Sequence, residues 1–375
     1  MATFALALSF AIWSLISSQS TRFQEELGLS DTQTGIMIAI PVLLGSIFRI
    51  PMGLLTEKYG GRLIFFLLMV FSIIPVLGLS TANSFEAVLA WGFLLGIAGT
   101  SFAVGIPFVS KWFPPEKQGL VLGIYGMGNI GTAVANFTVP LLNMSVGSQE
   151  TLYLYAIVTL LFAILYYIAV RDVKTDGAPP TLQDSFHLIK TTSAVWTLSI
   201  FYFLTFGSFV AMGNYLPKLL VDLFHITKVD AGLKTAGFVV LATLCRPIGG
   251  YLADKLGGHR ILNWVFIIFI AASLILAVTS TFYPVTIASL TMAVAAGLGN
   301  GAVFKLVPFY YQKQTGIVTG IAGAFGGIGG FFPPLLLGTI RQSTGNYFWG
   351  FTLLALFAVF CWWTNHKVSL ACSNP

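Results

Sequence analysis

The sequence predicts an all-α integral membrane protein with about twelve transmembrane helices in two six-helix, pseudo-symmetric halves. Hydrophobic residues make up 56% of its 375 residues and charged residues only 9%, whereas soluble proteins carry about 25% charged residues. Apolar runs long enough to cross a bilayer recur along the whole chain. Several motifs of the first half return about 197 residues later, which predicts an internal repeat.

The apolar runs form two sets of six. The first set covers 3–20, 33–55, 63–81, 86–111, 118–142 and 151–170. The second set covers 195–222, 231–254, 261–280, 284–310, 315–338 and 346–366. The longest polar stretch lies between the sets and contains two adjacent prolines, which predicts a linker. We therefore expect an N-terminal bundle over 1–170, a linker over 171–193 and a C-terminal bundle over 194–375.

The first apolar run lacks a preceding basic segment and a convincing cleavage site, so we interpret it as a membrane helix rather than a signal peptide. Basic residues lie unequally on the two sides of the predicted helices. One side carries Lys58, Arg62, Lys111, Lys117, Arg171, Lys174, Lys190, Lys255, Arg260, Lys313 and Lys367. The other side carries Arg22, Lys218, Lys228, Lys234 and Arg341. Because basic loops face the cytoplasm, we predict an inner (plasma) membrane protein with both termini and the linker in the cytoplasm.

Arg49 and Arg246 lie inside predicted membrane helices, in the matching stretches LLGSIFRIPMGLLTEKYGGR and LATLCRPIGGYLADKLGGHR. Each precedes the acidic residue of the following turn by eight positions, about 12 Å along a helix and near the middle of a roughly 30 Å hydrocarbon core. A charge there costs about 2.5–3.5 kcal/mol. All thirteen acidic residues fall in predicted loops or helix ends, so neither arginine has a carboxylate partner. Two unpaired guanidinium forks predict a binding site for a planar oxyanion.

Glycines cluster in the predicted fifth and eleventh helices, within GLVLGIYGMGNIG and GIVTGIAGAFGGIGG. At this density, glycines expose the backbone to a neighbouring helix or to a ligand, and we expect them to act when one half moves against the other. The candidate positions are Gly126, Gly128, Gly131, Gly323, Gly326 and Gly327, with the amide of Asn129 beside them. Lys305 is a third charge inside a predicted helix, and two interpretations stay open. Its amine either reaches a polar helix end or forms part of the anion path.

The two halves, the paired arginines and the glycine signatures resemble the nitrate/nitrite porter family of the major facilitator superfamily over nearly the whole chain. The resemblance implies the major facilitator fold and an anion clamped by Arg49 and Arg246. It also implies that aromatic side chains sandwich the planar anion, at positions that match Phe102, Tyr202 and Phe206. The asparagine of the first signature falls on Asn129, whereas Gly327 occupies the corresponding place in the second.

The predicted function is secondary active transport of nitrate and nitrite, by exchange and alternating access, in a protein that is not an enzyme. We expect these anions and membrane lipid as partners, one complete path in each monomer, no nucleic acid and no cofactor or metal. The three cysteines have no metal-site spacing, no His, Asp or Glu lies in mid-helix, and no GxxxxGK loop occurs. The alternatives are proton-coupled nitrate uptake through Lys305, transport of another small anion such as a monocarboxylate or a phosphate ester, and a passive channel.

Overall fold

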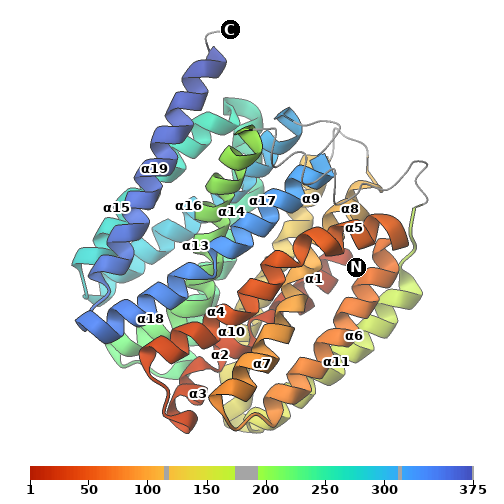
Figure 1. The fold of residues 1–375 in the computed structure, drawn as a ribbon, viewed down its shortest axis with the longest axis vertical. Helices are drawn as coiled ribbons and strands as arrows, with labels where there is room; N and C mark the ends of the chain where they lie inside the picture. Colours follow the sequence, from red (N-terminus) through yellow and green to blue (C-terminus); the bar gives the residue numbers. More distant parts are fainter. Residues whose placement is uncertain (114–117, 174–192, 311–314, 374–375) are drawn as a thin grey trace.

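The computed structural model describes residues 1–113, 118–173, 193–310 and 315–373, and within these ranges the chain forms helices and connecting turns without a strand (Figure 1). Nine helices in the described ranges are long and apolar enough to cross a membrane, or ten if the bent pair α4–α5 is one span. The predicted all-α membrane fold is therefore confirmed. The predicted linker falls largely on 174–192, outside the described residues, so the proposed domain boundaries stay a prediction.

Within the described residues, the first half contains twelve α- or 3₁₀-helical segments before its last helix, because several of its predicted spans are interrupted. Its elements are α1 (Ala2–Trp13), α2 (Leu15–Ser18), α3 (Ser20–Leu27), α4 (Asp31–Ile47), α5 (Arg49–Tyr59), α6 (Gly61–Ser80), α7 (Phe85–Leu95), η1 (Gly96–Thr100), α8 (Ser101–Ser110), α9 (Gln118–Gly126), η3 (Met127–Ile130), α10 (Gly131–Ser145) and α11 (Ser148–Ala169). The segments α4–α5, α7–η1–α8 and α9–η3–α10 correspond to the predicted second, fourth and fifth spans.

The second half is more continuous. Its elements are α13 (Ser193–Phe224), α14 (Lys228–Leu256), α15 (Gly258–Val278), α16 (Phe282–Tyr310), α17 (Thr315–Gly329), α18 (Phe332–Thr344) and α19 (Phe348–Ser373). Here α17 and α18 together correspond to the predicted eleventh span. Each of the twelve predicted runs therefore coincides with one helix or with one interrupted series of helices.

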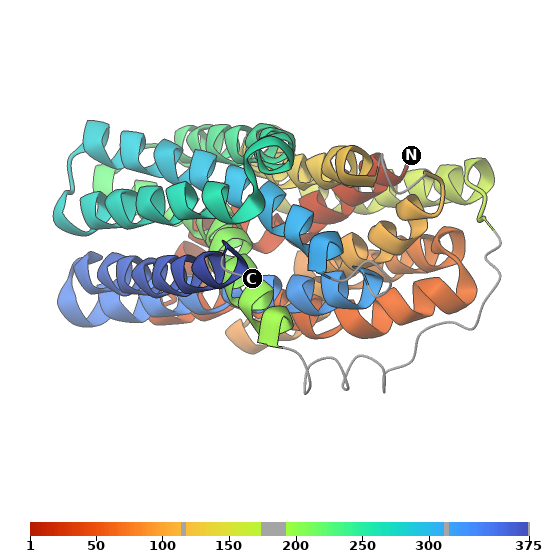
Figure 2. The same ribbon diagram turned by 90° about the horizontal axis from the view of Figure 1, so that it is seen from above.

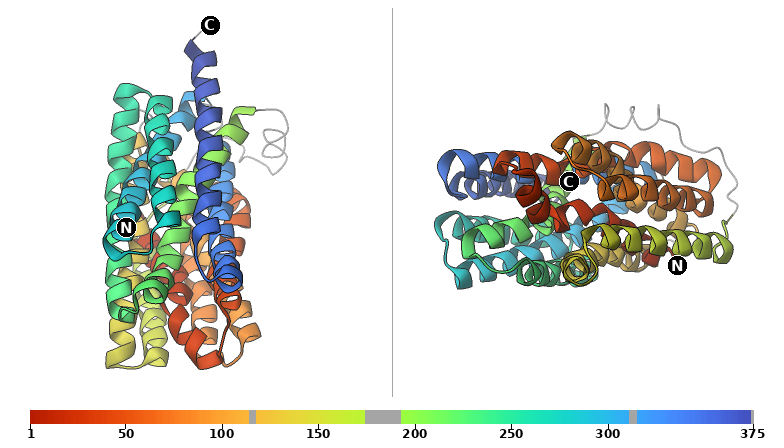
Figure 3. Two further views of the ribbon diagram at one scale, coloured as in Figure 1. Left: turned by 90° about the vertical axis from the view of Figure 1, so that its left-hand side faces the viewer. Right: turned by 90° about the horizontal axis from the view of Figure 1, so that it is seen from below.

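The same pairs of helices pack together in both halves. In the first half α11 packs against α6, and in the second half α19 packs against α15. Seen from above, most green-to-blue helices of the second half lie on the left and most orange-to-yellow helices of the first half on the right, and the two halves overlap in the centre (Figure 2). The halves meet where α4 contacts α17 and α18, and where α10 contacts α14 (Figure 3). The repeat in sequence is thus a repeat in helix packing.

The outer helices present apolar side chains to the surroundings. Leu161 and Ile168 on α11 and Val278 on α15 are 63%, 72% and 75% exposed. In water such a surface would be unstable, but in a bilayer it faces hydrocarbon. Two turn glycines that match in the repeat, Gly60 and Gly257, adopt φ of 89° and 87° just before α6 and α15. This left-handed conformation strains other residues, so it accounts for the glycines of the repeated turns.

Candidate functional site

Helix interruptions gather where the candidate residues lie. The chain bends by 42° between α4 and α5, immediately before Arg49. The 3₁₀ segment η1 ends two residues before Phe102, and η3 contains Asn129. Segments of 3₁₀ helix inside a span mark functional hinges, and discontinuous helices at mid-membrane expose backbone groups to a transported ion. The local glycine content favours these interruptions, because glycine is a poor former of helix interiors.

Arg49 lies at the start of α5, is 1% exposed and reaches across to the other half of the molecule. Its Nη1 donates to the carbonyl oxygen of Gly323 on α17, and its Nη2 lies 3.4 Å from the carbonyl oxygen of Gly99. Its Nε has no partner among the described residues. The guanidinium therefore bridges the halves through backbone carbonyls and keeps one buried donor free.

Arg246, at the middle of α14, is 4% exposed. Its Nη2 donates to the Tyr202 hydroxyl at 3.0 Å, while its Nη1 has no hydrogen-bond partner among the described residues. Neither Arg246 nor Arg49 forms an ion pair with a carboxylate in the part of the chain that the structure describes. Two buried cations with unsatisfied N–H groups are costly, and a bound anion would neutralise one of the two charges and accept hydrogen bonds from the free donors.

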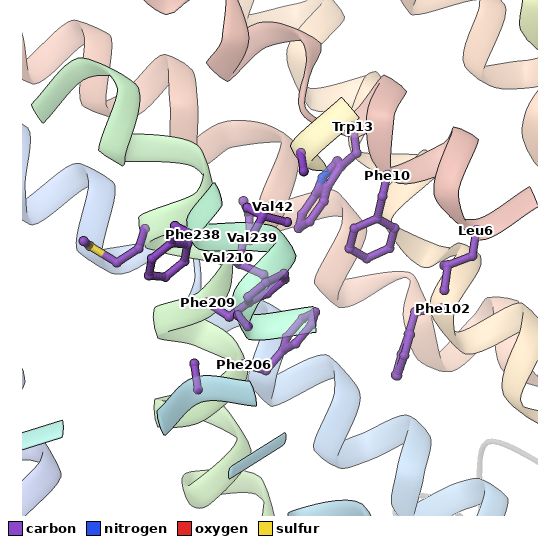
Figure 4. Close-up of a cluster of buried hydrophobic side chains, with 14 of the residues drawn as sticks. Leu6, Phe10, Trp13, Val42, Phe102, Phe206, Phe209, Val210, Phe238 and Val239 are labelled. Atoms are coloured by element: carbon purple, nitrogen blue, oxygen red, sulfur yellow. The ribbon is translucent and has the colours of Figure 1, made fainter. Parts of the chain in front are cut away.

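Aromatic rings separate and cover the two guanidinium groups. The Cζ of Arg49 lies 5.7 Å from the Phe102 centroid and 5.0 Å from that of Phe206. The Cζ of Arg246 lies 5.1 and 6.0 Å from the same two centroids. Figure 4 shows both rings inside the bundle, Phe102 from α8 and Phe206 from α13. Tyr202 stacks on Phe206 with centroids 4.9 Å apart and an interplanar angle of 9°. The structure thus brings together the two arginines indicated by the sequence and the three aromatic residues implied by the family resemblance.

Phe304 belongs to the same cluster, although the sequence did not indicate it. Its ring centroid lies 5.4 Å from the Cζ of Arg246, 4.9 Å from the Tyr202 centroid and 5.8 Å from the Phe102 centroid. The chain contains 33 phenylalanines, so composition and spacing give no reason to select this one. The one feature of the sequence that could have drawn attention to Phe304 is its position next to Lys305, a charged residue inside a predicted helix.

The candidate glycines divide into two groups. A Cβ at Gly126 would lie 3.2 Å from the Cζ of Arg246, and one at Gly323 would lie 3.9 Å from the Cδ of Arg49. These two glycines match in the repeat, and each faces the arginine of the opposite half. A Cβ at Gly327 would lie 2.3 Å from the Ser46 hydroxyl and 3.3 Å from the Nη1 of Arg49. The second group permits close packing instead, Gly128 on Leu6, Gly131 on Ala7 and Gly326 on Tyr202.

Two candidates are not joined to this cluster by any hydrogen bond or ion pair in the described residues. Asn129 is 2% exposed, and its Oδ1 has no hydrogen-bond partner there. Lys305 forms an ion pair with Asp254, and their side chains are 45% and 48% exposed. Asp254 follows Arg246 by eight residues on α14, about 12 Å along the helix. The placement of Lys305 agrees with the first interpretation of the sequence, an amine that reaches a polar helix end.

The chemistry of the cluster is that of binding rather than bond cleavage. Its polar groups are guanidiniums, hydroxyls and backbone carbonyls, and the histidine and carboxylate side chains that most often serve as general acids and bases are not among them. No group of three or more His, Cys, Asp or Glu that could hold a metal ion occurs within the described ranges. Two cations and flat aromatic faces suit a small, planar, weakly hydrated anion. The fold is that of a multi-pass membrane transporter, and two buried guanidinium groups lie where its two halves meet.

Comparisons with known proteins support this class. Residues 2–334 match the family described as Major Facilitator Superfamily, and a second match covers 220–369. The chain is 44% identical to the nitrite extrusion protein of Bacillus subtilis (strain 168) over 95% of its own length and 90% of that protein. It is 41% identical to the probable nitrate transporter NarT of Staphylococcus haemolyticus (strain JCSC1435) over 95% of its own length and 92% of NarT.

Solved structures share the fold. A bacterial homolog of the human lysosomal transporter Spinster, in an inward-facing and occupied conformation, has a TM-score of 0.75 at 16% identity over 98% of this chain and 95% of that one. The human organic anion transporter MFSD10 (TETRAN) has a TM-score of 0.74 at 14% identity, over 97% of both chains. The chain belongs to the Major Facilitator Superfamily and, within it, to the nitrate/nitrite porter family. It is a transporter, not an enzyme.

Proposed function

We propose that this protein exchanges nitrate and nitrite across the cell membrane by alternating access. The carrying observation is the pair of buried guanidinium groups, Arg49 and Arg246, which share the rings of Phe102 and Phe206 and lack a carboxylate partner among the described residues. The names of the relatives, nitrite extrusion protein and probable nitrate transporter, support nitrate and nitrite as the anions. Asn129 joins the site in this proposal as an amide donor.

Exchange follows from the fixed charge of the site. Arginine does not release its proton in a protein, so an empty site carries two positive charges through every conformation. An empty site in transit would bury both charges unpaired, whereas a bound anion neutralises one of them. The return step therefore favours a loaded site. We propose that nitrate entry and nitrite exit share one site in turn, with no net charge moved.

The proposal is tested with purified protein in proteoliposomes. Nitrate uptake is measured with internal nitrite, with internal acetate and with no exchangeable anion inside, at several pH values. We expect uptake that depends on internal nitrite or nitrate. Rapid uptake into vesicles without an internal partner would indicate a channel or a uniporter. Equal stimulation by acetate would indicate a monocarboxylate carrier instead.

Lys305 provides a separate prediction. A role in proton-coupled uptake requires its amine beside the arginines, but the amine pairs with Asp254. A half-exposed ion pair contributes about 0–1 kcal/mol, so Lys305→Met should leave nitrate/nitrite exchange within about fivefold of the parent rate. Lys111→Met is the matched control, because Lys111 pairs with Glu57, the repeat counterpart of Asp254. Strong uptake driven by an inward proton gradient, lost in Lys305→Met but kept in Lys111→Met, would overturn the exchange mechanism.

A further inference from the structure

A buried lysine connects the two halves at the end of the molecule that carries α3. Lys218, near the end of α13, is 1% exposed. Its Nζ lies 3.1 Å from the Oε1 of Gln24 on α3 and 2.9 Å from the Oδ1 of Asp31 at the start of α4. It also lies 2.9 Å from the Oδ2 of Asp222 on its own helix. One ammonium group therefore binds the first half through two residues and the second half through one.

The network is complete on both sides. An ammonium has three N–H donors, and Lys218 finds an acceptor in each of three different side chains. The Nε2 of Gln24 donates to the Oδ1 of Asp31 at 3.1 Å, within the first half. The Tyr347 hydroxyl donates to the Oδ2 of Asp222 at 2.8 Å, within the second half. Burial raises the pKa of Tyr347 above its ordinary value, so this hydroxyl keeps the proton that it donates.

Helix crossings close the same end on either side of Lys218. A Cβ at Gly35 on α4 would lie 2.7 Å from the carbonyl oxygen of Pro334 on α18. A Cβ at Gly232 on α14 would lie 2.2 Å from the carbonyl oxygen of Asn136 on α10. Gly35 and Gly232 match in the repeat, so the two crossings are pseudo-symmetric. Between them, Ser17 donates to the Oδ1 of Asn214 at 3.3 Å, and these residues are also repeat counterparts, 197 positions apart.

The corresponding glycines on the other side of the arginines make looser contacts. A Cβ at Gly123 would approach only the Cα of Pro247, at 3.9 Å, and a Cβ at Gly320 would have nothing within 4 Å. Gly123 and Gly320 lie on α9 and α17, in the same two predicted spans, the fifth and eleventh, that cross tightly at the α3 end. At these four glycines of the described residues, the opposite half is closer at the α3 end, where Lys218 lies, than on the other side of the arginines.

We propose that Lys218 is a gating residue that locks the α3 end closed, and that its bonds to Gln24 and Asp31 break and re-form in each transport cycle. The network divides cleanly when the halves separate. Lys218 keeps Asp222, which in turn keeps Tyr347, and Asp31 keeps Gln24. Each charge thus retains a partner while the end opens to water, so the lock is reversible. The proposal requires alternating access but not a particular anion.

The exposed pair between Lys228 and Glu25 offers a matched control. It also joins the two halves at this end, with Nζ and Oε2 2.6 Å apart, but the side chains are 43% and 67% exposed. Exposed pairs contribute about 0–1 kcal/mol, whereas removing one partner of a buried pair leaves an uncompensated charge. Burial, rather than the presence of a cross-half lysine, should decide which substitution opens the gate.

The test measures the opening of the α3 end directly. Spin labels at Glu26→Cys and Ser343→Cys, both exposed positions of opposite halves, report their separation by pulsed electron resonance in nanodiscs without added anion. In the parent, Cys245, Cys361 and Cys372 are replaced by alanine, so that only the two introduced cysteines react with the label. In the parent we expect mainly the short distance. Asp31→Asn, which leaves the Lys218–Asp222 pair intact, should raise the open-to-closed ratio at least about tenfold, equivalent to about 1.4 kcal/mol.

Lys218→Met should shift the ratio in the same direction, and Lys228→Met should leave it within about threefold of the parent. Unchanged distance distributions in folded Asp31→Asn and Lys218→Met proteins would overturn the gating role. A shift in Lys228→Met as large as that in Asp31→Asn would also overturn it, because surface charge alone would then explain the effect. Since the labels report conformation without nitrate or nitrite, a failure here is distinct from a failure of the proposed substrates.

Discussion

Replacing either central arginine by lysine is expected to lower nitrate exchange by about thirtyfold to a thousandfold while leaving the protein folded. Arg49 donates to the Gly323 and Gly99 carbonyls and lies over the rings of Phe102 and Phe206. A hydrogen bond from a charged group contributes about 1.5–3 kcal/mol, and a cation over an aromatic ring about 0.5–2 kcal/mol. A lysine ammonium keeps the charge but cannot bind in two directions and lie flat on a ring at once.

The measurement is nitrite-dependent nitrate uptake in proteoliposomes, with size-exclusion profiles and thermal unfolding to establish folding. Arg22→Lys is the control, because Arg22 makes a partly exposed ion pair with Glu26 four residues further on. It should transport normally. Near-normal exchange in both Arg49→Lys and Arg246→Lys would remove the two arginines as the anion clamp.

The fold and the burial of the two arginines could be predicted because both depend on features that are visible in the sequence alone. Span length and charge depletion identify membrane helices, and the 197-residue offset aligns Arg49 with Arg246. The depth of the arginines followed from counting residues to the turn acid at 1.5 Å per residue. The absence of a partner followed from the inventory of acidic residues. Each of these arguments concerns position along a helix axis, where distance is proportional to the number of residues.

Such arguments do not predict the direction in which a side chain points around the helix axis. Lys305 and Phe304 are adjacent on α16, yet one pairs with Asp254 and the other lies against Arg246. A change of one residue turns the side chain by about 100° around the helix axis. When a helix is apolar on nearly all sides, its sequence does not show which side faces the interior of the protein. The same limit applies to Lys218, which counted toward the charge of one membrane side but lies buried inside α13.

The repeat predicts that Gly126 and Gly323 are equivalent, but the structure shows that they differ. This difference leads to the second prediction with a large expected effect. Gly126 and Gly323 are counterparts, each facing the arginine of the other half. A Cβ at Gly126 would lie 3.2 Å from both the Cζ and the Nε of Arg246, closer than ordinary van der Waals contact, whereas one at Gly323 would lie 3.9 Å from Arg49. Gly126→Ala should therefore displace a guanidinium that Gly323→Ala leaves in place.

We expect Gly126→Ala to lower exchange by about tenfold or more, since small misplacements of a binding group cost up to about a hundredfold, and Gly323→Ala to stay close to the parent rate. Leucine at either position adds three further carbons next to a guanidinium and should stop exchange in both. Gly320→Leu, one turn earlier on α17 with open space around its Cβ, is the control and should transport. Expression level and nitrate binding are measured separately from turnover. Equal rates for Gly126→Ala and Gly323→Ala would mean that Arg246 adjusts its position freely, and active Leu variants at both sites would show that these glycines do not face the anion path.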